Sequence, residues 1–478
     1  MSDEILKLDG DWLFRTDPEK RLEKSGMLYK QAEKEEWSKI EVPSHWQLEN
    51  YDYQGTAWYY KSFNIANIEK NKHYYLEFEK ADYLAEIWLN GVYLGFNEGD
   101  FNSFSFQIND YLKEKNNLFV KVESGIDEKP EFKQIIKGGI YHWDCLPIEQ
   151  RGLNDCPEVP STANEQYPNP VVNPGGIWGS VKITGYDVLK LEDLKFPYSF
   201  IRNNSAEQQR DLKEEAKEEE EVFIKPQLRL KKLGNEAEKF SFVFKFRPLN
   251  FSGESYIFKE EKHLIPGMNS LDFSFTLNDI ERWWISELGS PNLYQAQLEI
   301  YKDENRILKS ETEIAFREVE IDKKFGLYIN GKRFYARGTN YLSAQFLSLS
   351  DQKLYDQDIK YMLNANINMV RLFSHLENDY FYQCCNREGI LIWQDLPFQW
   401  GYAEDISTLQ RSKKAAQKAV SKLYDHPSIF NWCLHSESRY HDYIKLDRVL
   451  ENTVKKIDSS RPIWKNSVFM TENKPPEF

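Results

Sequence analysis

Cysteines are scarce in this sequence, and blocks of basic residues and long apolar segments are missing. Its 478 residues include five cysteines, an odd number with Cys384 and Cys385 adjacent, which does not suggest a disulfide framework. We therefore expect reduced thiols and a cytoplasmic protein. The formal net charge is −14 and no block of lysine or arginine occurs, which argues against nucleic acid or a membrane surface as the main partner. No apolar segment approaches the roughly 18 residues of a membrane helix, and residues 1–7 lack the apolar core of a signal peptide.

Several catalytic signatures are missing as well. The G-x-S-x-G, Walker A and G-x-G-x-x-G motifs do not occur, so a serine hydrolase, an NTPase and a dinucleotide-binding enzyme lack support. No second His or Cys lies at ligand spacing from His375, which argues against a metal site there. We expect a protein that uses no cofactor.

Aromatic residues, in contrast, are abundant. They make up 15% of the chain and hydrophobic residues 41%, so a disordered chain is excluded, and the length suggests two to four domains. From Trp12 to about residue 185, short strands follow one another without helical periodicity. Asn90-Gly91 between two of them is typical of a hairpin turn, because both positions accept positive φ. Residues 1–185 are therefore predicted to form a β-sandwich, interrupted by a long irregular segment at 138–176.

The pattern changes twice further along the chain. Residues 186–320 contain a second series of strands, of a length that suits an immunoglobulin-like sandwich. From about Ile321, strands alternate with amphipathic helical segments, which predicts a parallel sheet covered by helices over residues 321–478. The predicted strands are 334–341, 369–375, 390–396, 429–437 and 462–468, and the predicted helices include 351–364 and 409–424.

Polar side chains follow these predicted strands at or near their carboxyl ends. They are Asn340, Arg371, His375, Asp395, Ser436 and Glu437. In a (β/α)₈ barrel the carboxyl ends of the strands meet at one mouth, where the catalytic groups lie. A glutamate at a strand end is most often a plain surface residue. The convergence of polar ends favours a functional interpretation of Glu437, as a proton donor whose pKa is raised by apolar neighbours such as Trp432.

Three other features admit both a structural and a functional interpretation. Arg371 and His375 could fix substrate hydroxyls and orient a carboxylate, or Arg371 could form an internal ion pair that stabilises the barrel; both can hold together. Trp178, in the glycine-rich segment 175–179, could support a turn or belong to a loop that presents aromatic residues to a sugar. Cys384 and Cys385 fall in a predicted helical segment, 380–387, and suit core packing better than redox chemistry.

The order of short motifs along essentially the whole chain resembles that of glycoside hydrolase family 2, which includes β-galactosidases, β-glucuronidases and β-mannosidases. The motifs are LDGDWLF at 8–14, VPSHW at 42–46, WYYKSF at 58–63, IWLNG at 87–91, GGIW at 175–178, PNLY at 291–294, FREV at 316–319, LYINGK at 327–332 and RGTN at 337–340. The resemblance implies a jelly-roll-like sugar-binding sandwich at 1–185, an immunoglobulin-like sandwich at 186–320 and a partial (β/α)₈ TIM barrel of about five strands at 321–478.

The resemblance also implies retaining hydrolysis of a β-linked sugar by two carboxylates about 5–5.5 Å apart. The family's acid/base follows a His-Pro-Ser…Trp…Asn-Glu pattern, which here begins at His426 and ends with Ser436-Glu437, so Glu437 inherits the role. Ser436 replaces an Asn that holds the sugar 2-hydroxyl. The implied substrate-binding residues are Asn340, Arg371, His375, Asp395, Trp432, Ser436 and Trp178.

The second carboxylate of the family is a Glu on the seventh barrel strand. The 158 residues from Ile321 onward hold about five strands, whereas a complete barrel takes ~250 residues. Glu472 and Glu477 flank a Pro pair and are poor substitutes. We therefore expect catalysis from a longer form, or from assembly with further copies or a complementing C-terminal chain.

Three function classes remain open at this level. The first is a glycosidase acting on a β-linked carbohydrate. The second is a carbohydrate-binding protein that does not cleave its ligand, which the expected lack of a nucleophile favours. The third is a structural scaffold, against which the position of Glu437 argues. The sequence does not identify the sugar.

Overall fold

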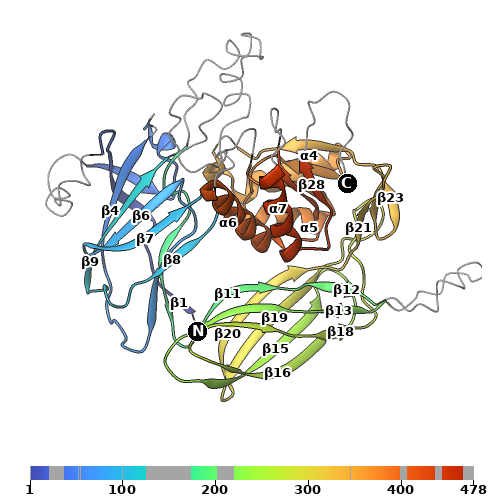
Figure 1. Ribbon diagram of the computed structural model, residues 1–478, viewed down its shortest axis with the longest axis horizontal. Coiled ribbons are helices and arrows are strands. Elements are labelled where there is room, and N and C mark those ends of the chain that lie inside the picture. Colours follow the sequence, from blue (N-terminus) through green and yellow to red (C-terminus); the bar gives the residue numbers. More distant parts are fainter. Residues whose placement is uncertain are drawn as a thin grey trace, which may run out of the picture.

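The computed structural model describes residues 2–20, 37–51, 53, 55–99, 101–124, 174–201, 220–344, 346–398, 406–436 and 444–466. Two β-sandwiches precede an α/β region along the chain (Figure 1). Figure 1 places the first sandwich on the left, the second at the bottom and the α/β region above it. Within the described residues, no helix is both long and apolar enough to cross a membrane.

The first sandwich consists of two antiparallel sheets. One sheet has the order β1 (Ser2–Lys7), β10 (Val181–Tyr186), β5 (His73–Phe78) and β8 (Phe104–Gln107). The other has the order β3 (Ser38–Val42), β2 (Gly10–Thr16), β4 (Thr56–Asn64), β9 (Lys115–Glu123), β6 (Leu84–Leu89) and β7 (Val92–Glu98). Asn90 and Gly91 connect β6 to β7 with φ values of 50° and 87°, which confirms the predicted hairpin.

The second sandwich has an immunoglobulin-like arrangement, as predicted. Its sheets are β11 (Leu189–Lys195), β14 (Gln227–Lys232) and β17 (Gly267–Asp272); β12 (Tyr198–Phe200), β13 (Val222–Ile224) and β18 (Phe275–Leu277); and β16 (Tyr256–Leu264), β15 (Glu238–Pro248), β19 (Tyr294–Lys302) and β20 (Asn305–Ile314). Every second residue of β15 from Phe240 to Phe246 is a buried phenylalanine, so one face of this strand supplies much of the core.

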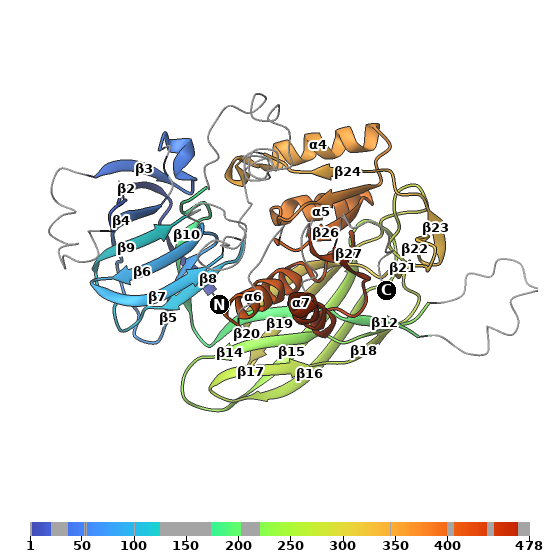
Figure 2. The ribbon, with the colours of Figure 1, turned by 45° about the horizontal axis from the view of Figure 1, so that its top comes forward.

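The α/β region contains the predicted parallel sheet. Its strands, in spatial as well as sequence order, are β24 (Gly338–Tyr341), β25 (Met369–Leu372), β26 (Leu391–Asp395), β27 (Ile429–His435) and β28 (Ile463–Asn466). All four neighbouring pairs are parallel. The helices are α4 (Gln352–Asn364), α5 (Asp379–Glu388), α6 (Ile406–Leu423) and α7 (Ile444–Ile457), of which α6 and α7 lie side by side in both views (Figures 1 and 2).

The predicted start of the first parallel strand was wrong. The strand expected to begin at Phe334 begins at Gly338, and Phe334 belongs to an antiparallel sheet of β21 (Val319–Ile321), β22 (Leu327–Ile329) and β23 (Lys332–Phe334). The reason is a second Asn-Gly turn: Asn330 and Gly331 have φ values of 49° and 75° and fold β23 back on β22. The turn pairs residues 332–334 with β22, so they belong to a different sheet from β24.

The second sandwich covers the amino-terminal ends of the parallel strands. Trp283 and Ile285 pack against Met369, Leu391 and Phe430, which lie at the starts of β25, β26 and β27. The opposite, carboxyl ends of the strands therefore face away from this sandwich.

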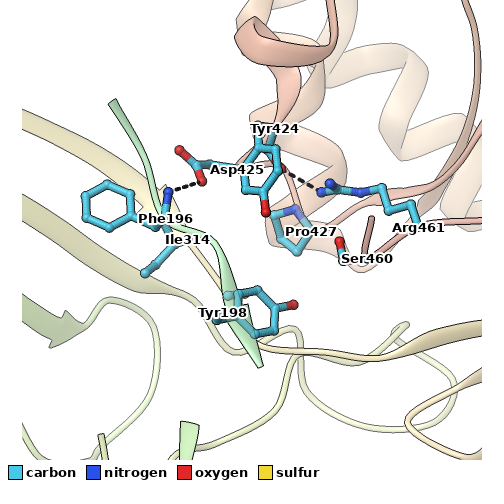
Figure 3. Close-up of a pocket in the computed structure, with 9 residues that line it drawn as sticks. Phe196, Tyr198, Ile314, Tyr424, Asp425, Pro427, Ser460 and Arg461 are labelled. Carbon is cyan, nitrogen blue, oxygen red and sulfur yellow. Dashed lines mark hydrogen bonds between the residues drawn. The ribbon is translucent and has the colours of Figure 1, made fainter. Parts of the chain in front are cut away.

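Polar contacts strengthen this junction. Trp283 Nε1 donates to the carbonyl of Asn386 (2.7 Å), and Arg317 Nε donates to the carbonyl of Pro427 (2.6 Å). Figure 3 shows Asp425, in the turn before β27, accepting a hydrogen bond from the backbone N–H of Phe196 (3.0 Å).

Candidate active site at the carboxyl ends of the parallel strands

An ion pair lies where β25 and β26 end. Arg371 Nε and Nη2 both donate to Asp395 Oδ2, at 3.1 and 2.5 Å. The Asp395 side chain is fully buried, whereas a fifth of the Arg371 side chain is exposed. Because a buried carboxylate is stable only when it is paired, Arg371 is held in a fixed orientation at the mouth of the sheet.

Ser436 joins the ion pair from the end of β27. Its hydroxyl donates to Asp395 Oδ2 and accepts from Arg371 Nη2 (3.2 Å). Three neighbouring strands thus contribute one polar residue each to a single cluster, which we call the Arg371 cluster (Arg371, Asp395 and Ser436). Ser436 directly precedes Glu437, which lies outside the described residues.

Asn340 lies on the next strand, beside the Arg371 cluster. It pairs in register with Arg371, across β24 and β25, and its side chain is exposed. Of the predicted site residues within the described part of the chain, Asn340, Arg371, Asp395 and Ser436 therefore lie at the same end of the sheet.

His375 lies beyond β25, which ends at Leu372 and not at residue 375 as predicted. Its Nδ1 lies 2.9 Å from the carbonyl of Phe373 and its Nε2 lies 3.0 Å from Glu377 Oε1. Burial works to lower the pKa of His375, but the carboxylate of Glu377 outweighs it and raises the pKa above its ordinary value. Conversely, burial works to raise the pKa of Glu377, and the hydrogen bonds from His375, Tyr355 and Ser343 bring it below its ordinary value.

Trp432 and Trp178, which were predicted to bind substrate, do not lie in the Arg371 cluster. Trp432 is fully buried among the helices on the other face of the sheet, where its Nε1 donates to Asp458 Oδ2 (2.7 Å). Strand alternation explains this position, because Asn431 and Cys433 take the opposite face. Trp178 is buried between the first sandwich and the α/β region, with its ring stacked on that of His45 (5.2 Å between centroids).

Sequence reasoning missed the residues that surround His375. Ser343 follows β24, Tyr355 lies on α4, and Phe373 and Glu377 follow β25. Phe373 and Glu377 are each two residues from His375, whereas Ser343 and Tyr355 come from other segments, so no local pattern marks these two. Among the described residues, no group of three or more His, Cys, Asp or Glu side chains is arranged to hold a metal ion.

Comparison with known proteins extends the description beyond the fold. Residues 36–179 match a family model described as glycosyl hydrolase 2 galactose-binding domain-like, residues 204–317 the model glycosyl hydrolases family 2, and residues 319–474 that family's TIM barrel domain. A β-galactosidase of Thermoanaerobacterium thermosulfurigenes is 22% identical over 90% of this chain and 53% of its own length. A β-mannosidase of Mus musculus is 23% identical over 79% of this chain and 42% of its own length.

Solved structures of similar proteins share the fold. The β-D-mannosidase from Dictyoglomus thermophilum superposes with a TM-score of 0.73 and 25% identity over 97% of this chain and 58% of that one. A Bacteroides uniformis β-glucuronidase gives a TM-score of 0.72 and 18% identity over 97% and 52%. This chain spans about half the length of the curated relatives it matches. Since three models of one family match successive segments that cover most of its residues, the chain belongs to glycoside hydrolase family 2.

Proposed function

We propose that this chain carries the sugar-binding residues and the proton donor of a retaining β-glycosidase. The observation that carries the proposal is the Arg371 cluster, built at the carboxyl ends of three adjacent parallel strands and immediately followed by Glu437. In a (β/α)₈ barrel these ends line the active site. The names of relatives, β-galactosidase, β-glucuronidase and β-mannosidase, support a β-linked glycoside as the substrate class.

Each residue of the cluster has a distinct part in the proposed chemistry. Arg371 offers charged N–H donors to sugar hydroxyls from an orientation fixed by Asp395, and Ser436 adds a hydroxyl beside them. Glu437 donates a proton to the glycosidic oxygen as the bond to the anomeric carbon breaks, and then takes a proton from the water that replaces the leaving group. Asn340 extends the same surface along β24.

A retaining mechanism also needs a carboxylate on the opposite face of the sugar. Asp395 and Glu377 are both buried and engaged by hydrogen bonds, so neither is free to attack an anomeric carbon. The second carboxylate therefore comes from residues outside the described ones, from a longer form of the chain, or from a partner chain. The same observation favours a second candidate function, namely binding of a carbohydrate without cleavage.

Binding and turnover by the 478-residue chain distinguish these functions. We expect calorimetry with methyl β-galactoside, β-glucuronide and β-mannoside to detect binding to at least one of them. Arg371→Met should abolish that binding, while the control Arg229→Met, at an exposed position of the second sandwich, should leave it unchanged. Equal affinity of the Arg371 and Arg229 variants would contradict the proposed site.

Turnover is then assayed with the corresponding aryl β-glycosides. Negligible release of the aryl group by the chain alone, and release by a longer or complemented form, would support the glycosidase. Binding without release by every form would favour the non-cleaving protein.

We also propose a cytoplasmic location for the chain. The described cysteines, Cys384, Cys385 and Cys433, are all free and buried, which supports reduced thiols. Cys384 and Cys385 pack in the core around α5, as predicted. Fractionation of the native host would test the location, and recovery of the protein outside the cell would contradict it.

A further inference from the structure

Glu377 is a buried carboxylate beside the proposed sugar site. Its side chain is fully buried, and four groups donate hydrogen bonds to it or lie at hydrogen-bond distance. They are the Ser343 backbone N–H (3.1 Å), the Ser343 hydroxyl (2.9 Å), the Tyr355 hydroxyl (2.8 Å) and His375 Nε2 (3.0 Å). A carboxylate with this many donors is held in its ionised form, and a cation must balance it.

The hydrogen bonds of His375 identify that cation. Nε2 faces the Glu377 carboxylate and Nδ1 faces the Phe373 carbonyl, and both of these partners can only accept. Both ring nitrogens must therefore carry a hydrogen, which makes His375 an imidazolium. The raised pKa of His375 agrees with this geometry.

The imidazolium fixes a segment that touches the Arg371 cluster. Its Nδ1 holds the carbonyl of Phe373, and the Phe373 ring lies 4.5 Å from the Arg371 guanidinium carbon. Gln394 Nε2 donates to the carbonyl of His375 (2.9 Å), which ties the same segment to β26. The stacked ring covers one face of the guanidinium, so Arg371 is directed toward Asp395 and Ser436.

The hydrogen bonds around Glu377 also connect the α/β region to the first sandwich. The hydroxyls of Ser343 and Ser350 lie 2.6 Å apart, and Asn378 Nδ2 donates to the carbonyl of Ser350 (3.2 Å). Lys80, from the first sandwich, donates to Asn378 Oδ1 and lies 4.1 Å from the Trp178 ring centroid. This gives Trp178 a structural place at the junction.

We infer that Glu377 is a positioning residue: it holds His375 as an imidazolium and fixes the orientation of its ring, so that Nδ1–H stays on the Phe373 carbonyl and Phe373 stays against Arg371. This inference rests on the proposed function of the Arg371 cluster. It predicts that His375 stays an imidazolium at neutral pH while Glu377 is present, and that sugar affinity falls when Glu377 is replaced by a side chain that cannot bond to the ring.

The other titratable side chains described near His375 do not form a hydrogen bond with its ring. Arg371 and Asp395, from β25 and β26, form a pair with each other. Tyr341 donates to Asp358, Tyr355 to Glu377 and Tyr382 to Gln394, and the pKa values of these three tyrosines are raised by burial, so they stay neutral. Of these groups, Glu377 is the one with a hydrogen bond to the His375 ring, and the charge of Asp395 adds to its effect on the pKa of His375.

The test uses nitrogen NMR of the whole chain with selectively labelled histidine, together with sugar affinity between pH 5.5 and 8.5. In the wild type we expect His375 to show two protonated ring nitrogens at pH 7.5. In Glu377→Gln burial should lower the pKa of His375 below its ordinary value, and a neutral ring that accepts from the Gln amide can still donate Nδ1–H to Phe373, so sugar affinity should be kept. In Glu377→Leu, which offers no group to orient the ring, sugar affinity should fall by about five- to tenfold, from the loss of one hydrogen bond. Glu388→Gln, at an exposed position of α5, is the matched control and should behave as the wild type.

Several results would overturn the inference. A neutral His375 ring in the wild type at pH 7.5 would do so without any variant, even if Glu377→Gln failed to fold. Unchanged sugar affinity in a folded Glu377→Leu variant would also overturn it. If the wild type bound no sugar, the proposed function would fail, while the histidine spectrum would still decide whether Glu377 holds His375 as a cation.

Discussion

Replacement of Arg371 by methionine removes the cation that balances Asp395. The Asp395 side chain is fully buried, and its described partners besides Arg371 include the Ser436 hydroxyl. Removing one member of a buried ion pair costs about 3–5 kcal/mol, because the other charge is left without compensation. Since a fifth of the Arg371 side chain is exposed and Ser436 stays bonded to Asp395, we expect a loss near the lower end, about 3 kcal/mol.

A double-mutant cycle separates the charge from the packing. Asp395→Asn alone should cost about 1–2 kcal/mol, because the remaining Arg371 is partly solvated. The double variant Arg371→Met/Asp395→Asn should regain about 2 kcal/mol relative to Arg371→Met, since an amide tolerates burial better than an unpaired carboxylate.

Hydrogen exchange is a suitable assay because a multidomain chain need not unfold in one step. Protection of β25, β26 and β27 in urea would report the stability of the sheet that holds the cluster. Additive costs of the two single changes would refute the reasoning, because they would show that Arg371 and Asp395 do not stabilise each other.

Three further predictions concern other parts of the molecule. Burial raises the pKa of Asp425 to about 7, so the folded state binds its proton more tightly than the unfolded state and stability falls as pH rises from about 4 to 7. Asp425→Asn should therefore be more stable than the wild type at pH 8, by roughly 1–3 kcal/mol in thermal unfolding, and no more stable near pH 4; equal stability at both pH values would contradict this. Trp283→Phe should destabilise the junction by about 1 kcal/mol in denaturant unfolding, through loss of the bond to Asn386, and an unchanged midpoint would show that this bond contributes nothing. In a form that hydrolyses aryl β-glycosides, Glu437→Gln should lower turnover of poor leaving groups by about 10²–10⁴-fold and that of activated ones much less, and equal losses would remove Glu437 as the proton donor.

Successive strands without helices occupy the sequence up to about residue 320, and strands that alternate with helices follow. This change of pattern predicted the parallel sheet. The start of the first parallel strand was misplaced because a hairpin turn before it was overlooked. Asn330-Gly331 has the same turn chemistry as Asn90-Gly91, and could have been interpreted as a hairpin in the same way.

The candidate site was predictable where it depends on strand ends. Arg371, Asp395 and Ser436 follow separate strands, and parallel pairing brings them together. The face of the sheet on which a side chain lies was harder to predict, because an error of one residue in register moves the side chain to the opposite face. Trp432 was assigned to the site because it precedes Glu437 in the pattern shared with the family, although it lies on the helix-facing side of the sheet. Glu377 is two residues from His375, but its contacts with Ser343 and Tyr355 depend on tertiary structure, so the sequence did not show them.

A crystal structure of the 478-residue chain with a bound β-glycoside would test the central claim most directly. The account predicts sugar hydroxyls within hydrogen-bond distance of Arg371, and the glycosidic oxygen within hydrogen-bond distance of the Glu437 carboxyl group. A sugar bound away from the carboxyl ends of the parallel strands, with Arg371 untouched, would contradict it.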